Sequence, residues 1–137
     1  MKENELFNAW MSLTKYHNRL LKAMDYTLKN RFQLGMKEFY LMYYLLHSEH
    51  KQMRLSALVP KVELSHSALS RLVKRLEYHP MGALVQRQSV EQDKRSVDIF
   101  LLDQGEQAVK EMQSLIQESL QSQISDKDMR NMKRLIE

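Results

Sequence analysis

Residues 64–76 constrain the fold of this chain more than any other stretch, because their apolar members recur at helical spacing. Four of them, at i, i+3, i+4 and i+7, fall on one side of an α-helix: Leu69, Leu72, Val73 and Leu76. The other side holds short hydroxyl groups and cations without a carboxylate: Ser67, Ser70, Arg71 and Lys74, flanked by His66 and Arg75. The apolar side is therefore expected to face a core.

Ser65 precedes this segment and is a plausible N-cap for the helix. The start of a helix has free N–H groups and partial positive charge, which suit phosphate oxygens. We interpret the segment as a DNA recognition helix. On these residues alone, a surface helix whose cations are simply solvated remains an equal alternative.

The net charge of +4 is distributed unevenly along the 137 residues. Residues 1–50 carry +2, residues 51–97 carry +5 and residues 98–137 carry −3. The positive excess coincides with the recognition-like helix, as expected of a protein that binds a polyanion. The acidic end should lie away from the same polyanion.

Composition also limits the compartment and the chemistry. The absence of cysteine excludes a disulfide scaffold and a thiolate nucleophile. No apolar run approaches the roughly 18 residues of a membrane span, and the N-terminus lacks the pattern of a signal peptide. We therefore expect a cytoplasmic protein with no membrane contact.

Helical spacing extends over most of the chain. Residues 5–30 predict a long helix with an apolar seam, and residues 36–47 predict a central buried helix. After a short extended segment at 53–55, Ser56 is expected to cap a helix that ends near Val62. Pro60 lacks an N–H group, so we expect that helix to start later or to open with a looser turn. A short helix, a tight turn and residues 64–76 form a helix-turn-helix.

The second half of the chain predicts a wing and two more helices. Residues 84–89 and 96–102 are expected to be strands, joined by a polar loop at 90–95. Asp103 should cap the next helix, and a break near residues 123–126 precedes a last short one. The predicted fold is mainly α with a small β-hairpin wing.

Several segments, taken in order, resemble the MarR family of winged helix-turn-helix transcription regulators: Leu55–Val59, Leu64–Glu77, Gly82–Arg87, Asp93-Lys94-Arg95 and Leu102–Gly105. Asp93 and Arg95 occupy the family's Asp-x-Arg wing motif. The chain departs from the family pattern at Pro60, at Glu63, where the family has glycine, and in a longer connection at 78–81. The resemblance implies one domain, 1–137, with a winged helix-turn-helix at about 34–105 and dimerisation helices at 5–30 and 106–137.

This interpretation assigns site residues in three groups. The residues expected to bind DNA are Ser65, His66, Ser67, Ser70, Arg71, Lys74, Arg75, Arg87, Lys94 and Arg95. Asp93 is expected to support Arg95 in the wing by accepting hydrogen bonds. The expected dimer interface consists of Leu6, Trp10, Leu13, His17, Met112, Ile116, Leu120 and Met132.

Neither enzyme chemistry nor a cofactor is expected, because the sequence has no phosphate-binding glycine loop and no cysteine. His47, Glu49 and His50 form the one metal-like cluster, but exposed polar residues are ordinary at a helix end, so we expect no metal site. The ten methionines fit core and dimer contacts. They would also suit the adaptable walls of a pocket for a small apolar or aromatic effector.

The sequence therefore predicts a dimeric, sequence-specific regulator, a repressor by the family resemblance, that binds a pseudo-palindromic operator in double-stranded DNA. The alternative is a non-catalytic protein-interaction module that keeps the winged-helix shape. Salt dependence distinguishes them, because counterion release makes DNA binding weaken steeply as salt increases.

Overall fold

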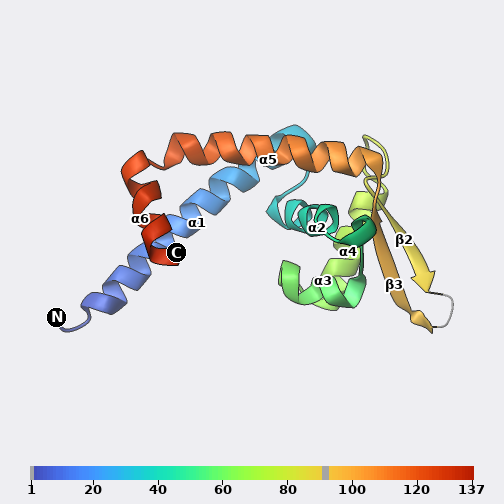
Figure 1. Ribbon diagram of the computed structural model, residues 1–137, viewed down its shortest axis with the longest axis horizontal. Coiled ribbons are helices and arrows are strands. Elements are labelled where there is room, and N and C mark those ends of the chain that lie inside the picture. The colour runs from blue at the N-terminus through green and yellow to red at the C-terminus, as the bar shows by residue number, and fades with distance from the viewer. Residues whose placement is uncertain (1, 91–92) are drawn as a thin grey trace. The chain divides into compact units, whose positions relative to one another are not determined.

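The structure, a computed structural model, describes residues 2–90 and 93–137, and only the backbone of Val90 and residues 93–95. Six α-helices and three strands follow one another along this part of the chain (Figure 1). Their bounds are α1 Glu5–Phe32, α2 Met36–Leu46, β1 Gln52–Arg54, α3 Leu55–Val62, α4 His66–Glu77, β2 Val85–Val90, β3 Asp93–Leu101, α5 Asp103–Gln123 and α6 Asp126–Ile136, with a 3-10 turn, Glu49–Lys51, before β1. The mainly α fold predicted from the sequence is confirmed.

Contacts divide the chain into two compact units. One unit combines residues 1–34 with residues 114–137, and the other is the continuous stretch 35–113. Within the parts of the chain that the structure describes, no helix is both long and apolar enough to cross a membrane.

The unit 35–113 holds a three-stranded antiparallel sheet in the order β1-β3-β2. Ile99 of β3 lies between Met53 of β1 and Arg87 of β2 in the register. Pairing of β1 with β3 was not predicted from the sequence. Strand β3 is also longer than predicted, since it begins at Asp93 rather than at residue 96.

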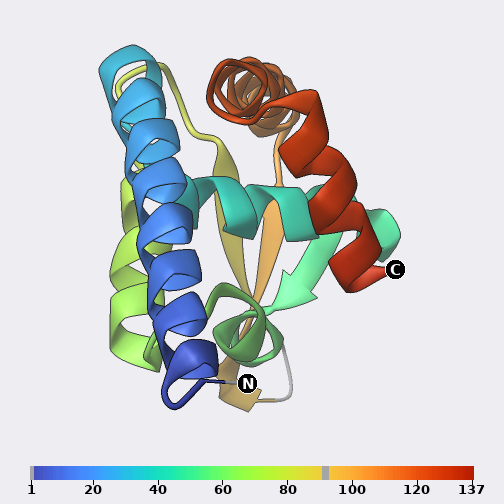
Figure 2. The ribbon, with the colours of Figure 1, turned by 90° about the vertical axis from the view of Figure 1, so that its left-hand side faces the viewer.

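Helices α3 and α4 bury their apolar sides together with the sheet. The fully buried side chains of this core include Leu58 of α3, Leu69 and Leu76 of α4, and Ile99 of β3. Figure 2 shows β1 beside β3 in this unit. The core holds one side of α4 against its neighbours, so the opposite side of the helix is left for contact with solvent or a ligand.

The start of α3 corrects the sequence prediction. The helix begins at Leu55 with Arg54 as N-cap, so Ser56 is not the cap, and Pro60 lies inside the helix. Pro60 cannot donate to the carbonyl of Ser56, four residues earlier, but Ser56 is exposed and its carbonyl can bond water. Placing proline late in a two-turn helix therefore does not prevent the helix from starting before Ser56.

A left-handed residue, Glu63, ends α3 and makes the turn into α4. Its φ and ψ are 60° and 50°, and its N–H donates to the Val59 carbonyl at 3.0 Å. Lys37 of α2 donates from Nζ to the Val62 carbonyl at 2.7 Å, satisfying another terminal acceptor of α3.

The other unit consists of α1, the C-terminal part of α5, and α6. Ser125 caps α6 by accepting from the Asp128 N–H at 3.1 Å, and α6 turns sharply away from the end of α5 (Figures 1 and 2). The break predicted near residues 123–126 is confirmed. The start of α5 differs slightly from the prediction, because Asp103 is the first residue of the helix rather than its cap.

Candidate nucleic-acid interface

Helix α4 begins with the serine cap that the sequence predicts. The Ser65 hydroxyl accepts from the Ala68 N–H at 3.2 Å and lies 3.4 Å from the Ser67 hydroxyl. Capping satisfies one of the free N–H groups of the first turn. Ser65, His66 and Ser67 are all exposed around this end of the helix.

The two sides of α4 differ as the sequence predicts. Its apolar residues, Leu69, Leu72, Val73 and Leu76, are almost completely buried. Arg71 and Lys74 on the other side are exposed, and Ser70, directly before Arg71, is half-buried. The structure thus gathers two cations and several hydroxyl groups on one accessible side of a firmly packed helix.

Arg75, also predicted to bind DNA, has a protein partner. Its guanidinium lies 3.2 Å from Oε1 of Glu38, a carboxylate that is 12% exposed and accepts from the Gly35 N–H through its other oxygen at 3.0 Å. This ion pair connects α4 to the start of α2. Nothing in the sequence pairs residues 37 positions apart, so Glu38 was not identified.

Arg87 of β2 likewise has partners within the unit. Nε and a terminal nitrogen lie 3.0 Å and 2.9 Å from Oε1 of Glu77, and the terminal nitrogen donates to the Ser70 carbonyl at 3.3 Å. Glu77 was not among the predicted site residues. Arg87 therefore connects the first strand of the wing to α4.

The predicted wing contacts fall on side chains that the structure does not describe. Asp93, Lys94 and Arg95 belong to β3 by their backbone, so they are not in the loop where the sequence analysis placed them. Their side chains lie outside the described residues, and the support of Arg95 by Asp93 remains a prediction.

The long connection between α4 and β2 is held by hydrogen bonds. Leu84 N–H donates to the Leu76 carbonyl at 3.0 Å, and Gln104 of α5 donates to the Met81 carbonyl at 2.5 Å. His79 is 7% exposed, and its Nδ1 accepts from the Met81 N–H at 3.2 Å. The extra residues therefore form a hydrogen-bonded turn in which His79 is buried and Tyr78 and Met81 are exposed.

Most residues predicted for the dimer interface are accessible in a single chain. Leu6, Trp10 and Leu13 of α1 are 70%, 64% and 47% exposed, and Met132 of α6 is 42% exposed. His17 is also exposed, while Ile116 and Leu120 are half-buried. Met112 corrects the prediction, because it is fully buried within one chain and offers no surface to a second.

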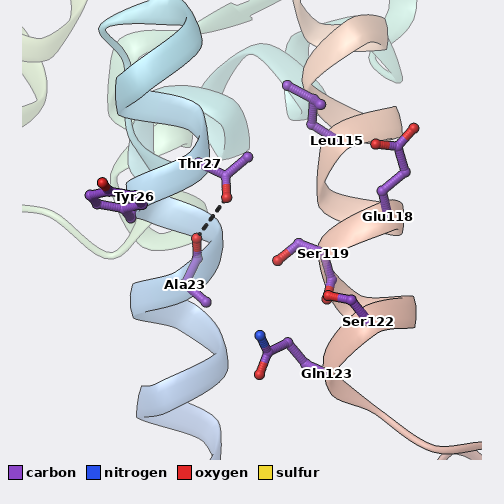
Figure 3. Close-up of a pocket in the computed structure, with 8 residues that line it drawn as sticks. All are labelled: Ala23, Tyr26, Thr27, Leu115, Glu118, Ser119, Ser122 and Gln123. Carbon is purple, nitrogen blue, oxygen red and sulfur yellow. Dashed lines mark hydrogen bonds between the residues drawn. The ribbon is translucent and has the colours of Figure 1, made fainter.

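Two hollows lie in the unit formed by α1, the end of α5, and α6. One, of about 390 Å³, is lined by Ala23, Tyr26 and Thr27 of α1 and by Leu115, Glu118, Ser119, Ser122 and Gln123 of α5 (Figure 3). The Thr27 hydroxyl donates to the Ala23 carbonyl at 3.0 Å, and the Ser122 hydroxyl donates to the Ser119 carbonyl at 2.8 Å. These hydroxyl groups are therefore engaged by their own helices. A second hollow, of about 500 Å³, lies against α5 and α6 and has Leu120, Ile124, Met129 and Met132 in its wall.

The pKa values of Tyr40 and Glu106 are shifted. Burial, with Tyr44 and Glu63 nearby, raises the pKa of Tyr40 above 10.0, so its phenol stays neutral. Hydrogen bonds from Lys51 and Lys110 lower the pKa of Glu106 below 4.5. The metal-like cluster does not assemble: His50 lies 3.6 Å from Glu49, and no group of three metal-type side chains forms among the residues that the structure describes.

A scan of known protein families matches residues 23–112, more than half of the chain, to the family described as transcriptional regulator SarA/Rot. The chain belongs to the SarA/Rot family. Its residues 35–113 contain the helix-turn-helix and the wing, and almost all of them lie inside the matched range. Comparison with curated proteins finds no match for this SarA/Rot regulator.

Solved structures confirm the fold. A MarR family transcriptional regulator from Streptomyces coelicolor, solved in complex with DNA, is 18% identical, with a TM-score of 0.80 over 99% of this chain and 86% of that one. AbsC, another MarR family regulator from S. coelicolor, is 22% identical, with a TM-score of 0.78 over 100% of this chain and 92% of that one. BpsR of Bordetella bronchiseptica is 17% identical, with a TM-score of 0.76 over 94% of this chain and 96% of that one; 6-hydroxynicotinic acid regulates its DNA binding. The MarR resemblance of this SarA/Rot regulator is thus confirmed.

Proposed function

We propose that this SarA/Rot regulator is a cytoplasmic, non-catalytic homodimer that binds double-stranded DNA sequence-specifically and represses transcription. The observation that carries the proposal is the exposed side of α4. It presents Arg71 and Lys74 with the hydroxyl groups of Ser65 and Ser67, while the other side is buried in the core. A packed helix with cations and small hydroxyl groups facing outward fits the major groove.

The residues of this surface take different roles. Arg71, near the middle of the helix, reads a base edge, since arginine can donate two hydrogen bonds to guanine. Lys74 holds a phosphate as a point charge. Ser65, His66 and Ser67, at the helix start, contact base edges or the adjoining phosphates.

Association into a dimer would cover the apolar residues that a single chain leaves accessible. These residues, on α1 and α6, include Leu6, Trp10, Leu13, Met132 and Ile136. Surfaces of this kind are typical of protein contacts. Two-fold symmetry would place two α4 helices in successive major grooves, about 10–10.5 base pairs apart, so the operator is pseudo-palindromic.

A small apolar or aromatic effector releases the DNA in this proposal. The hollow of about 500 Å³ beside α5 and α6 falls within the usual size of ligand sites and has methionines in its wall. Met129 and Met132 belong both to this hollow and to the exposed stripe of α6. A ligand bound there would therefore act on the contact between the two copies.

Selection of binding sites from a random pool of duplex DNA with the purified protein tests the proposal. We expect an enriched sequence with two-fold symmetry, bound with an affinity that decreases log-linearly with salt. A pool without enrichment, or binding indifferent to salt, would contradict it and favour a protein-interaction module instead.

A further inference from the structure

We propose that Arg87 is a positioning residue: it sets the wing against the recognition helix through Glu77 and Ser70, and it does not itself contact DNA. The inference rests on the proposed function, since it assumes that α4 enters the DNA. It gives Arg87 a different role from Arg71 and Lys74, the exposed cations of the same surface.

The geometry of the three groups carries the inference. Arg87 lies within 3.3 Å of both partners, and its side chain and that of Glu77 are 33% and 22% exposed. Ser70 belongs to the middle of α4 and Glu77 is its last residue, so one guanidinium contacts two residues of α4 that are seven positions apart. A planar guanidinium that donates in two directions fixes a strand relative to a helix better than a single ammonium group could.

The charges around these residues also favour a positioning role for Arg87. Glu77 compensates the charge of Arg87 at 2.9 Å, whereas Arg71 and Lys74 are exposed and no carboxylate partner is recorded for them in the described part of the chain. To bind Arg87 at Nε or at the bonded terminal nitrogen, a phosphate would have to displace Glu77 and the Ser70 carbonyl. The exposed cations need no such exchange.

The sign of one substitution separates positioning from DNA contact. Glu77→Gln removes a negative charge, so it would strengthen DNA binding if it freed Arg87 for a phosphate. If Arg87 acts by positioning, Glu77→Gln instead weakens binding to the selected operator by about three- to tenfold, because the charge-assisted bond between the wing and α4 becomes a weaker, neutral one. Arg87→Gln should weaken binding by the same factor, and the double variant should be no weaker than either single variant.

Salt dependence supplies the second readout. Each protein–phosphate contact contributes about 0.9 to the slope of log affinity against log salt. We expect wild-type protein and Arg87→Gln to have the same slope, whereas Lys74→Gln should lower it by about 0.9. Arg87→Lys keeps a positive charge but not the two-directional geometry, so it should weaken binding as Arg87→Gln does.

Glu106→Gln is the matched control, because it makes the same charge change at an ion pair to which α4 contributes no residue, Lys51–Glu106 at 2.6 Å. It should leave operator affinity within about twofold of wild type. Tighter binding by Glu77→Gln, a lower salt slope for Arg87→Gln, wild-type affinity in both, or losses that add in the double variant would each overturn the inference. If one Gln variant fails to fold, Arg87→Lys and the remaining variant decide. Failure of wild-type protein to bind the operator would contradict the proposed function instead.

Discussion

Gly105 of α5 lies against Leu84, the residue before β2, and Gly105→Ala tests how tightly the two meet. A Cβ added at Gly105 would overlap the carbonyl oxygen of Leu84, and it would lie 2.7 Å from Cδ1 of Leu101 and 3.0 Å from the carbonyl carbon of Leu84. Ordinary carbon contacts begin at about 3.5 Å, so α5 and the segment at Leu84 must separate. The Leu84 carbonyl also accepts from the Leu102 N–H at 3.0 Å, a hydrogen bond that the separation would break.

The expected cost follows from these contacts. Overpacking costs about 1–3 kcal/mol and the lost hydrogen bond about 1 kcal/mol, while alanine gains up to about 1 kcal/mol over glycine as a helix former. The net expectation is a loss of about 2 kcal/mol in the free energy of unfolding. Urea unfolding at fixed protein concentration measures it as a lower midpoint at unchanged slope. Gln107→Ala, at an exposed position of the same helix, should change the free energy by less than about 0.5 kcal/mol. A similarly small change for Gly105→Ala would refute the close approach.

Four further changes test other parts of the molecule. Arg71→Ala should weaken binding by about 1–3 kcal/mol more on the selected operator than on random DNA, as titration of both duplexes would reveal; equal losses would make Arg71 a phosphate contact. Leu13→Glu should raise the dimer dissociation constant by at least about tenfold in sedimentation, whereas Lys15→Glu should not. Ser65→Ala should lower the free energy of unfolding by about 1 kcal/mol, and Ser65→Asp should restore stability while weakening DNA binding; full stability of the alanine variant would contradict the cap. Since the pKa of Glu106 is lowered, its stabilising contribution is present above pH 4.5 and is lost as the pH falls below that value. Urea unfolding of Glu106→Gln should therefore show a smaller loss of stability in acid than wild-type protein shows. An equal loss of stability in the two proteins would contradict this expectation.

Helix α4 was predictable because its determinants are local. The i, i+3, i+4, i+7 spacing placed the apolar stripe, and a hydroxyl residue directly before it placed the cap at Ser65. Both signals depend on positions within a few residues of each other. The same reasoning identified α6 and the break before it, where Ser125 is the cap.

Contacts between distant parts of the chain were not predictable in the same way. Arg75 and Arg87 were predicted to bind DNA from their place near a basic helix, and nothing in the sequence indicates that each has a carboxylate partner from another element. Met112 keeps helical spacing with the exposed seam, and periodicity alone does not separate a residue buried in one chain from one buried between two. The predicted start of α3 was wrong because the effect of the missing N–H group of Pro60 was judged for a helix capped by Ser56, whereas the helix begins at Leu55.

The turn between α3 and α4 combines a strained backbone with a negative charge. Glu63 adopts a left-handed backbone, a conformation that costs a residue with a side chain about 1–2 kcal/mol and glycine little. Its exposed carboxylate stands just before α4, where it repels phosphates. The backbone strain lowers the stability of the fold whether or not DNA is bound, whereas the carboxylate acts only when a phosphate comes near. In the proposed complex with DNA, this negative charge would therefore shorten the residence time of the regulator.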